Sequence, residues 1–500
     1  MGEGQRALEA LVGRRASLSR RAVARPGWQW QDVRVGSLVH CTAVELAQLT
    51  RRREVSCREV LDAHLARIEE HNGRLGAVTV VLRDSALALA KERDRSREPG
   101  PLHGVPFTVK EDLDCLGSAT THGVPALSDA LPYEDAPAVA RLKAAGAIPI
   151  ARTNTSELGL RLCTSNPLRG RTLNPYGRQW TAGGSSAGDA VAVATGMAAL
   201  GLGSDLGGSL RVPAHCSGVA TLKPTTGRVA HASSLPPRDH GMAGQAMLAV
   251  GPLARSVADL RAVLQVLAGR DRRDPLSVDV PLDGPAPRER RAALVTRVPG
   301  CTLEPAARAA LERAGRALTA AGWLVEEETP PEIAAVNQVF AQLLATDLEV
   351  IRRELEPFLS DALSGYLLRL CRWAKRTETS NLRLHSERSR LSRAWSAFFS
   401  RYPIVVGPNW GRALWRPDAD LDPVSGIALL EETTAFITPG SVLGLPSLAL
   451  PMGLAEGLPT SVLIYADLWR EDLCLEAAAR IESSMPPLWP IEPTESESVS

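Results

Sequence analysis

Apolar and polar positions follow a helical period near the start of the chain. The spacing predicts two helices within residues 42–71. One stripe of this segment is apolar and consists of Val60, Leu61, Leu65 and Ile68. Two capping boxes mark the predicted starts, Thr42 with Glu45 and Ser56 with Glu59. This part of the chain therefore has well-marked helical ends before any tertiary contact is considered.

Residues 102–110 alternate instead with the period of a strand. The alternation predicts one face with Val105, Phe107 and Val109, and an opposite face with Thr108 and Lys110. A predicted helix at about 136–145 then leads through Gly146 into an apolar strand at 147–151. This succession of strands and helices is typical of α/β proteins.

The rest of the chain continues the same alternation. Further helices are predicted at 84–94, 256–268, 304–321 and 470–484, and further strands at 291–297, 323–328, 403–407, 447–451 and 460–465. Residues 332–400 are mainly helical and dotted with aromatic side chains. We expect one large mixed α/β domain at 38–487, with a helical insertion at about 330–400. Residues 1–37 are expected to be a lead-in, and residues 488–500 a disordered acidic tail.

Charge and composition exclude several classes of protein. The 57 basic and 56 acidic residues leave a net charge of +1, so we expect no nucleic-acid partner. No apolar run reaches the roughly 18 residues that a membrane helix requires, and the Arg-rich start does not look like a secretory signal. The eight cysteines are dispersed without a C-x-x-C pair, which argues against a disulfide framework or a zinc site. A cytoplasmic protein is expected.

Lysine is rare, which makes each lysine informative. It occurs at five positions, 91, 110, 143, 223 and 375, whereas every other basic residue is arginine or histidine. A buried lysine can lose its proton, and arginine keeps its charge. Lys110 lies in an apolar, Pro- and Gly-rich segment and is therefore a candidate base.

Two Gly-Ser clusters are candidates for a reactive loop. Glycines before a serine allow the backbone to approach a ligand closely. If a helix starts near Ser209, the N–H groups of Leu206, Gly207, Gly208 and Ser209 are unpaired and suit an oxyanion. An ordinary turn would have the same composition.

A serine nucleophile needs a base, and three arrangements compete. Gly184-Ser185-Ser186-Ala187-Gly188 matches the G-x-S-x-G elbow with Ser186 as nucleophile, but no apolar strand precedes it. No lysine has a serine three residues before it, which excludes S-x-x-K. The third arrangement uses Lys110, Ser185 and Ser209, with one serine between the lysine and the nucleophile.

Seven segments in order resemble the amidase signature family, from about residue 40 to residue 485. They are His103-Gly-Val-Pro-Phe-Thr-Val-Lys110, Thr153-Asn154-Thr-Ser-Glu157-Leu-Gly, Gly183-Gly-Ser185-Ser186, Gly203-Ser-Asp205-Leu-Gly-Gly-Ser209-Leu-Arg211-Val-Pro, Leu222-Lys-Pro-Thr-Thr-Gly-Arg, Gly251-Pro-Leu-Ala-Arg-Ser-Val-Ala-Asp259 and Gly444-Leu-Pro. The resemblance implies a central mixed β-sheet surrounded by helices, with the signature core at about 100–230.

The resemblance also implies the site residues. Ser209 would be the nucleophile, Ser185 the proton relay after a cis Gly184–Ser185 peptide, and Lys110 the base. This mechanism would require no metal and no organic cofactor. Ser186 is expected to hydrogen-bond near the catalytic serine, although a turn-stabilising role is an equal alternative. Asp205 and Arg211 are expected to brace the loop as a charge pair. Asn154, Glu157 and Lys223 are expected to be structural.

The chain departs from the family pattern at several positions. Ala187 replaces a usual Gly, which would place a methyl group beside the relay, and Ser461 stands in a C-terminal motif that has lost its Gly and Gln. Aromatic residues of the variable segments are candidates for an acyl pocket: Phe340, Tyr366, Trp373, Trp395, Trp410 and Trp415.

The leading functional hypothesis is a hydrolase that cleaves a small-to-medium carboxamide. The alternatives are the glutaminase subunit of a transamidation complex, an acyl transferase that forms an amide, an esterase, and a scaffold with a relic site. A small-molecule amide is the expected partner, and a homodimer is the default oligomeric state.

Overall fold

The computed structural model describes residues 35–235, 241–374 and 380–494. Most of the predicted lead-in and the last six residues lie outside this range. No helix of the described part is long and apolar enough to cross a membrane. All eight cysteines are free thiols.

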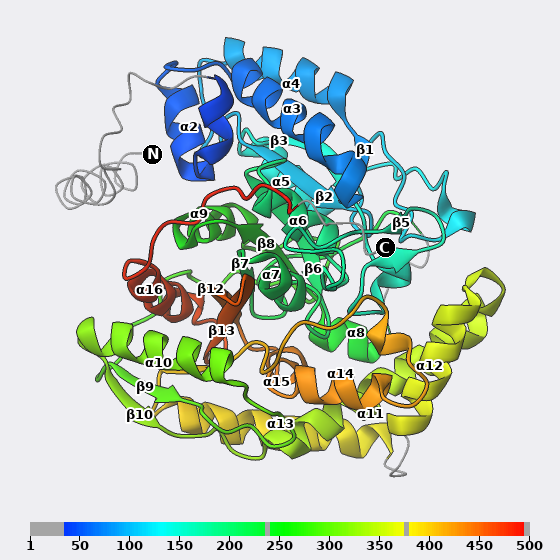
Figure 1. The fold of residues 1–500 in the computed structure, drawn as a ribbon, viewed down its shortest axis with the longest axis vertical. Helices are drawn as coiled ribbons and strands as arrows, with labels where there is room; N and C mark the ends of the chain where they lie inside the picture. Colours follow the sequence, from blue (N-terminus) through cyan, green and yellow to red (C-terminus); the bar gives the residue numbers. More distant parts are fainter. Residues whose placement is uncertain (1–34, 236–240, 375–379, 495–500) are drawn as a thin grey trace.

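One sheet of 11 strands runs through the described part of the chain (Figure 1). Its order is β1-β3-β2-β6-β8-β7-β12-β13-β11-β9-β10. The strands are β1 (Val78–Val81), β2 (Pro106–Lys110), β3 (Ile148–Thr153), β6 (Leu200–Asp205), β7 (Ala220–Lys223), β8 (Ala249–Ala254), β9 (Arg291–Leu294), β10 (Leu324–Glu327), β11 (Ile404–Pro408), β12 (Ser447–Ala455) and β13 (Leu458–Ala466). A separate hairpin pairs β4 (Ser165–Asn166) with β5 (Gly170–Arg171). The large sheet contains both parallel and antiparallel pairs, so it is mixed, as predicted.

Helices cover both faces of this sheet. They are α2 (Ala43–Arg51), α3 (Cys57–Leu75), α4 (Arg83–Arg95), α5 (Pro137–Ala144), α6 (Ala187–Ala194), α7 (Arg211–Ser217), α8 (Met242–Met247), α9 (Val257–Leu267), α10 (Pro305–Ala320), α11 (Ile333–Leu355), α12 (Asp361–Ala374), α13 (Asn381–Phe399), α14 (Gly426–Thr434), α15 (Thr438–Val442) and α16 (Glu471–Glu482). The predicted helical insertion is present as α11, α12 and α13, which lie in the lower part of Figure 1.

Side chains of β12 alternate between two apolar cores on the two faces of the sheet. In β12, Leu448 and Leu450 pack into the core that contains α5, α9, α10 and α16, whereas Ala449 packs into the core that contains α7, α11 and α13. Phe107 and Val109 of β2 belong to the first core. Lys110 therefore lies at the end of a strand whose apolar face is fixed by packing, and the predicted alternation in this strand is confirmed.

Helix ends were predicted best. Both capping boxes are present, at Thr42 before α2 and at Ser56 before α3. The strand expected over 102–110 begins only at Pro106, because Leu102 to Val105 form turns. Strands β1, β6, β7 and β8 of the large sheet were not predicted, since they are short or nearly fully buried and have no alternating pattern.

The prediction of a disordered tail is wrong for residues 488–494. Ile491 donates its N–H to the carbonyl of Ala194 at 2.9 Å and packs against an apolar cluster around α6 and α7. Glu492 pairs with Arg67 of α3 at 3.0 Å. These contacts with distant segments order a segment whose composition alone indicates disorder.

Candidate active site

The site begins where two parallel strands end side by side. Strand β2 pairs with β6 in parallel, with Val109 opposite Leu202. Lys110 is the last residue of β2, and Ser204 and Asp205 are the last residues of β6. Carboxyl ends of parallel neighbours open on the same edge, so these side chains come together although 94 residues separate Lys110 from Ser204.

Lys110 is completely buried, and three oxygen atoms surround its amine. Its Nζ lies 2.7 Å from Ser185 Oγ, 2.8 Å from Ser204 Oγ and 2.8 Å from Asp112 Oδ2. Burial alone would raise the pKa of Asp112, but the adjacent Lys110 and the nearby His122 hold it below the usual value. The contact between Lys110 and Ser185 joins two of the three predicted catalytic residues.

Asp112 and Ser204 were not predicted as partners of Lys110. Asp112 lies in the turn that follows β2, so the alternation of the strand does not extend to it. The contact with Ser204 depends on the register between β2 and β6, which no local pattern encodes.

Ser185 and Ser186 lie in the Gly-rich loop that precedes α6. The Gly184–Ser185 peptide is cis, as the resemblance implied. Ser186 donates its N–H to the carbonyl of Ser209 at 3.1 Å and its hydroxyl to the carbonyl of Ser204 at 3.2 Å. Gly203 permits this packing, since a Cβ there would lie 2.7 Å from Ser186 Oγ. Ser186 therefore ties the relay loop to the loop of Ser209.

Ser209 lies in the loop between β6 and α7. The N–H of Gly208 donates to Asp205 Oδ1 at 2.8 Å. The prediction that this N–H is free to bind an oxyanion is therefore wrong, because the Asp205 carboxylate already accepts it. Within the described residues, the N–H groups of Leu206, Gly207 and Ser209 have no acceptor. No hydrogen bond joins the hydroxyls of Ser185 and Ser209 in the described chain, although both serines line one cavity.

Asp205 and Arg211 form a fully buried ion pair at 2.8 Å. Asp205 also accepts the N–H of Leu210, and Arg211 donates to Ser441 Oγ and to the carbonyl of Ile437. Burial would raise the pKa of Asp205, but Arg211 lowers it to about 2. The pair therefore anchors the Ser209 loop to the segment before and within α15, in agreement with the predicted charge pair.

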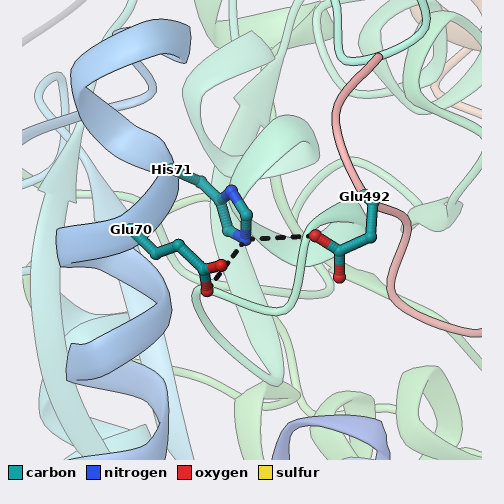
Figure 2. Close-up of side chains that lie close together, drawn as sticks. All are labelled: Glu70, His71 and Glu492. Atoms are coloured by element: carbon teal, nitrogen blue, oxygen red, sulfur yellow. Dashed lines mark ion pairs between the residues drawn. The ribbon is translucent and has the colours of Figure 1, made fainter. Parts of the chain in front are cut away.

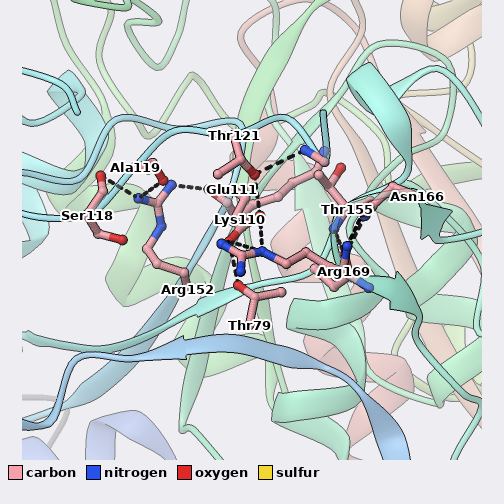
Figure 3. Close-up of polar contacts among 12 residues, drawn as sticks. Thr79, Lys110, Glu111, Ser118, Ala119, Thr121, Arg152, Thr155, Asn166 and Arg169 are labelled. Atoms are coloured by element: carbon pink, nitrogen blue, oxygen red, sulfur yellow. Dashed lines mark hydrogen bonds and ion pairs between the residues drawn. The ribbon is translucent and has the colours of Figure 1, made fainter. Parts of the chain in front are cut away.

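The backbone behind Lys110 is held by a second buried network (Figure 3). Arg152 of β3 donates to the carbonyls of Lys110 at 3.1 Å, Val109 at 3.2 Å and Ala119 at 3.1 Å. Glu111 turns away from the amine, accepts from Thr79 at 2.7 Å and pairs with Arg169 at 2.9 Å. Glu111 therefore holds the end of β2 in place through Thr79 and Arg169, whereas Lys110 and Asp112 contact each other at the site.

A cavity of about 1180 Å³ opens at this edge of the sheet. Its wall contains Asp112, Ser185, Ser204 and Ser209. Much of the remaining wall is apolar and comes from α11, α12 and α14, including Leu344, Leu348, Ile351, Leu370, Ile427 and Leu430. The helical insertion and α14 therefore supply much of the apolar wall of the cavity.

Half of the predicted pocket aromatics line this cavity. The three that line it are Phe340, Tyr366 and Trp373. The other three, Trp395, Trp410 and Trp415, are buried in the apolar core instead, so their predicted pocket role is wrong. Phe340 lies over the nucleophile loop, because a Cβ on Gly207 would be 3.1 Å from its Cζ. Aromatic spacing alone did not separate core from pocket.

Several other sequence predictions concern neighbours of the site. Glu157 accepts the N–H of Ser360 at 2.8 Å, and Asn154 accepts the N–H of Thr155 at 3.0 Å, so both satisfy buried backbone groups as predicted. Ala187 does not narrow the site, because its methyl packs in the core around α3 and α6. Ser461 lies 2.7 Å from His215 Nδ1, away from the cavity.

One cluster in the described chain has three groups that could hold a metal: Glu70, His71 and Glu492 (Figure 2). Arg74 donates to His71 Nδ1 at 3.3 Å, which places the ring hydrogen on Nε2, where it faces Glu70 at 3.2 Å. Arg67 already pairs with Glu70 at 3.3 Å and Glu492 at 3.0 Å. The cluster is therefore better described as a set of ion pairs that joins α3 to the C-terminal segment than as a metal site.

Comparisons with known proteins identify the family of the chain. The family model described as Amidase matches residues 59–475. The chain is 39% identical over 477 residues to an indoleacetamide hydrolase of Bradyrhizobium diazoefficiens, covering 92% of this chain and 87% of that protein. It is 30% identical over 466 residues to an acylamidase of Rhodococcus erythropolis, covering 89% of this chain and 95% of that protein.

A solved structure of 6-aminohexanoate cyclic dimer hydrolase has a TM-score of 0.77 and 25% identity, covering 91% of this chain and 99% of that one. The chain belongs to the amidase signature family and is an amide hydrolase that acts on C–N bonds.

Proposed function

We propose that this amidase hydrolyses a carboxamide with an apolar or aromatic acyl part through an acyl-Ser209 intermediate. The observation that carries the proposal is the 2.7 Å contact between Lys110 and Ser185, on the wall of the same cavity as Ser209. A hydroxyl between the amine and the nucleophile can accept one proton and pass on another.

In the proposed mechanism, the neutral amine of Lys110 takes a proton from Ser185 while Ser185 takes the proton of Ser209. The Oγ of Ser209 forms a bond to the amide carbon. The N–H groups of Leu206, Gly207 and Ser209 face the developing oxyanion. The proton then returns through Ser185 to the leaving nitrogen, and the C–N bond breaks. Water attacks the acyl ester by the same relay and releases the carboxylate and free Ser209.

The cavity lining supports an apolar acyl group. Its volume of about 1180 Å³ and its Leu, Ile and aromatic side chains suit a substrate that buries apolar surface. Phe340 lies over the nucleophile loop and would contact the acyl part first. The relative named indoleacetamide hydrolase makes indole-3-acetamide the first compound to test.

The proposal is tested by comparing three substrates of the purified chain: indole-3-acetamide, malonamide and glutamine. We expect indole-3-acetamide to have the highest kcat/KM. Higher kcat/KM with malonamide would overturn the apolar acyl part. Turnover of glutamine alone would favour the glutaminase subunit of a transamidation complex.

A matched pair of variants places the acyl group. Phe340→Ala should lower kcat/KM for indole-3-acetamide about 10-fold or more, since burial of one Phe contributes ~1.5–3 kcal/mol. Phe398→Ala, on α13 of the same insertion but outside the cavity lining, is the control. Equal losses in the two variants would contradict the assignment of Phe340.

A further inference from the structure

The side chain of Asp112 contacts only the catalytic cluster. Oδ2 lies 2.8 Å from Lys110 Nζ and accepts from Ser204 Oγ at 2.5 Å. Oδ1 is buried without a partner in the described chain. The neighbouring carboxylates differ, because Glu111 binds Arg169 and Asp114 accepts the N–H of Ser234. Asp112 therefore braces no backbone segment.

The three contacts around Lys110 set the direction of its hydrogens. Ser204 has one hydroxyl hydrogen, which it donates to Asp112, so its oxygen is left to accept from Lys110. Asp112 is ionised and can only accept. Two of the three tetrahedral positions on Nζ must therefore be N–H groups that point to Ser204 and Asp112.

The remaining position on Nζ faces Ser185 at 2.7 Å. A neutral amine has two N–H groups and one lone pair. If both N–H groups are held by Ser204 and Asp112, the lone pair points at the Ser185 hydroxyl, which is the direction required of a base. A protonated amine fills the same position with a third N–H and cannot accept.

We propose that Asp112 is the positioning residue of Lys110: it orients the amine so that the lone pair of its neutral form faces the Ser185 hydroxyl. This inference rests on the proposed role of Lys110. Because Asp112 is a carboxylate 2.8 Å from the amine, its replacement should change the pH dependence of the reaction as well as its rate.

Other charged groups reach the same cluster and must be separated from Asp112. Asp189 of α6 accepts from Thr108 at 2.6 Å, and burial raises its pKa to about 7. His122, which lines the cavity, lowers the pKa of Asp112 through its charge. Asp112 in turn acts on Arg152 of β3, whose pKa its negative charge raises. Protonation of Asp189 near pH 7 would also produce an acidic limb, so Asp189 needs its own variant.

The test is the rate of Ser209 labelling by an alkyl fluorophosphonate as a function of pH, which requires no known substrate. Asp112→Asn should move the acidic limb of the labelling rate at least about 1 pH unit lower, as expected for loss of an adjacent opposite charge. The plateau rate should fall about 10-fold, because the amine loses its fixed orientation. If the acidic limb of the labelling rate stays at the same pH in Asp112→Asn, the inference is overturned, whatever the plateau rate. A merely structural role would lower the labelling rate equally at every pH.

Two control variants complete the experiment. Asp114→Asn removes a carboxylate two residues away that does not touch Lys110, and its limb should stay in place. In Asp189→Asn, the labelling rate should still fall at low pH as in the wild type. Loss of this fall would assign the titration to Asp189 and overturn the inference. Labelling that does not depend on Ser209 would instead contradict the proposed function.

Discussion

Two lysines are fully buried at the ends of strands, yet their amines have different surroundings. Lys110 of β2 meets the hydroxyls of Ser185 and Ser204 and the carboxylate of Asp112, beside a cavity. Lys223 of β7 donates to the carbonyls of Pro224 at 2.8 Å and Leu445 at 3.1 Å. A carbonyl neither gives nor takes a proton, whereas a hydroxyl does both.

The comparison shows that burial does not by itself make a catalytic base. Burial, with a smaller effect of Arg211, lowers the pKa of Lys223 to about 7. A shifted pKa is often used to find functional residues, but here it would select a lysine that contacts only backbone oxygens and does not line the described cavity. The partners of the amine distinguish the two lysines.

The largest expected effect is on catalysis. Lys110→Met keeps most of the side-chain volume and removes the amine, so kcat should fall about 10²–10⁴-fold. Lys223→Met is the matched control and should retain activity per folded molecule. Equal losses in both variants, measured on samples with matched circular dichroism, would remove the distinction between them.

A second expected effect concerns the buried ion pair between Asp205 and Arg211, which anchors the Ser209 loop. Asp205→Ala leaves Arg211 buried without its partner and should lower the free energy of unfolding by about 3–5 kcal/mol. Glu332→Ala breaks an exposed pair with Arg390 and should lower the free energy of unfolding far less, because solvent screens the exposed charges. Chemical denaturation measures both, and a small loss in Asp205→Ala would contradict the anchoring role.

The smallest expected effect is the pH dependence caused by Lys223. Its pKa is about 7 in the folded protein and 10.5 when unperturbed, so between these values the unfolded chain binds a proton that the folded chain does not. Stability should therefore rise with pH in this window, by at most roughly 1.4 kcal/mol per pH unit.

Lys223→Met should lack this contribution. The difference in unfolding free energy between wild type and variant should change steadily from pH 7 to pH 9, in the direction of a more stable wild type. A difference that stays constant would show that Lys223 is not held neutral by the fold.

Local signals predicted the helices and the site motif but not the contacts between strands. The boxes at Thr42 and Ser56 were predictable because the hydrogen bonds lie within four residues. Lys110, Ser185 and Ser209 came from the motif resemblance. The contact with Ser204 depends on the pairing of β2 with β6, and the capture of the Gly208 N–H by Asp205 depends on the path of the loop. Neither leaves a periodic trace in the sequence.

The central claim is that Ser209 is a nucleophile activated through Ser185 by Lys110. The most direct measurement is intact mass after treatment with an alkyl fluorophosphonate, for wild type, Ser209→Ala, Ser186→Ala and Lys110→Met. The account predicts one adduct on wild type and Ser186→Ala, none on Ser209→Ala, and strongly slowed labelling of Lys110→Met. An adduct that persists in Ser209→Ala and disappears in Ser186→Ala would contradict the account and assign the nucleophile to Ser186.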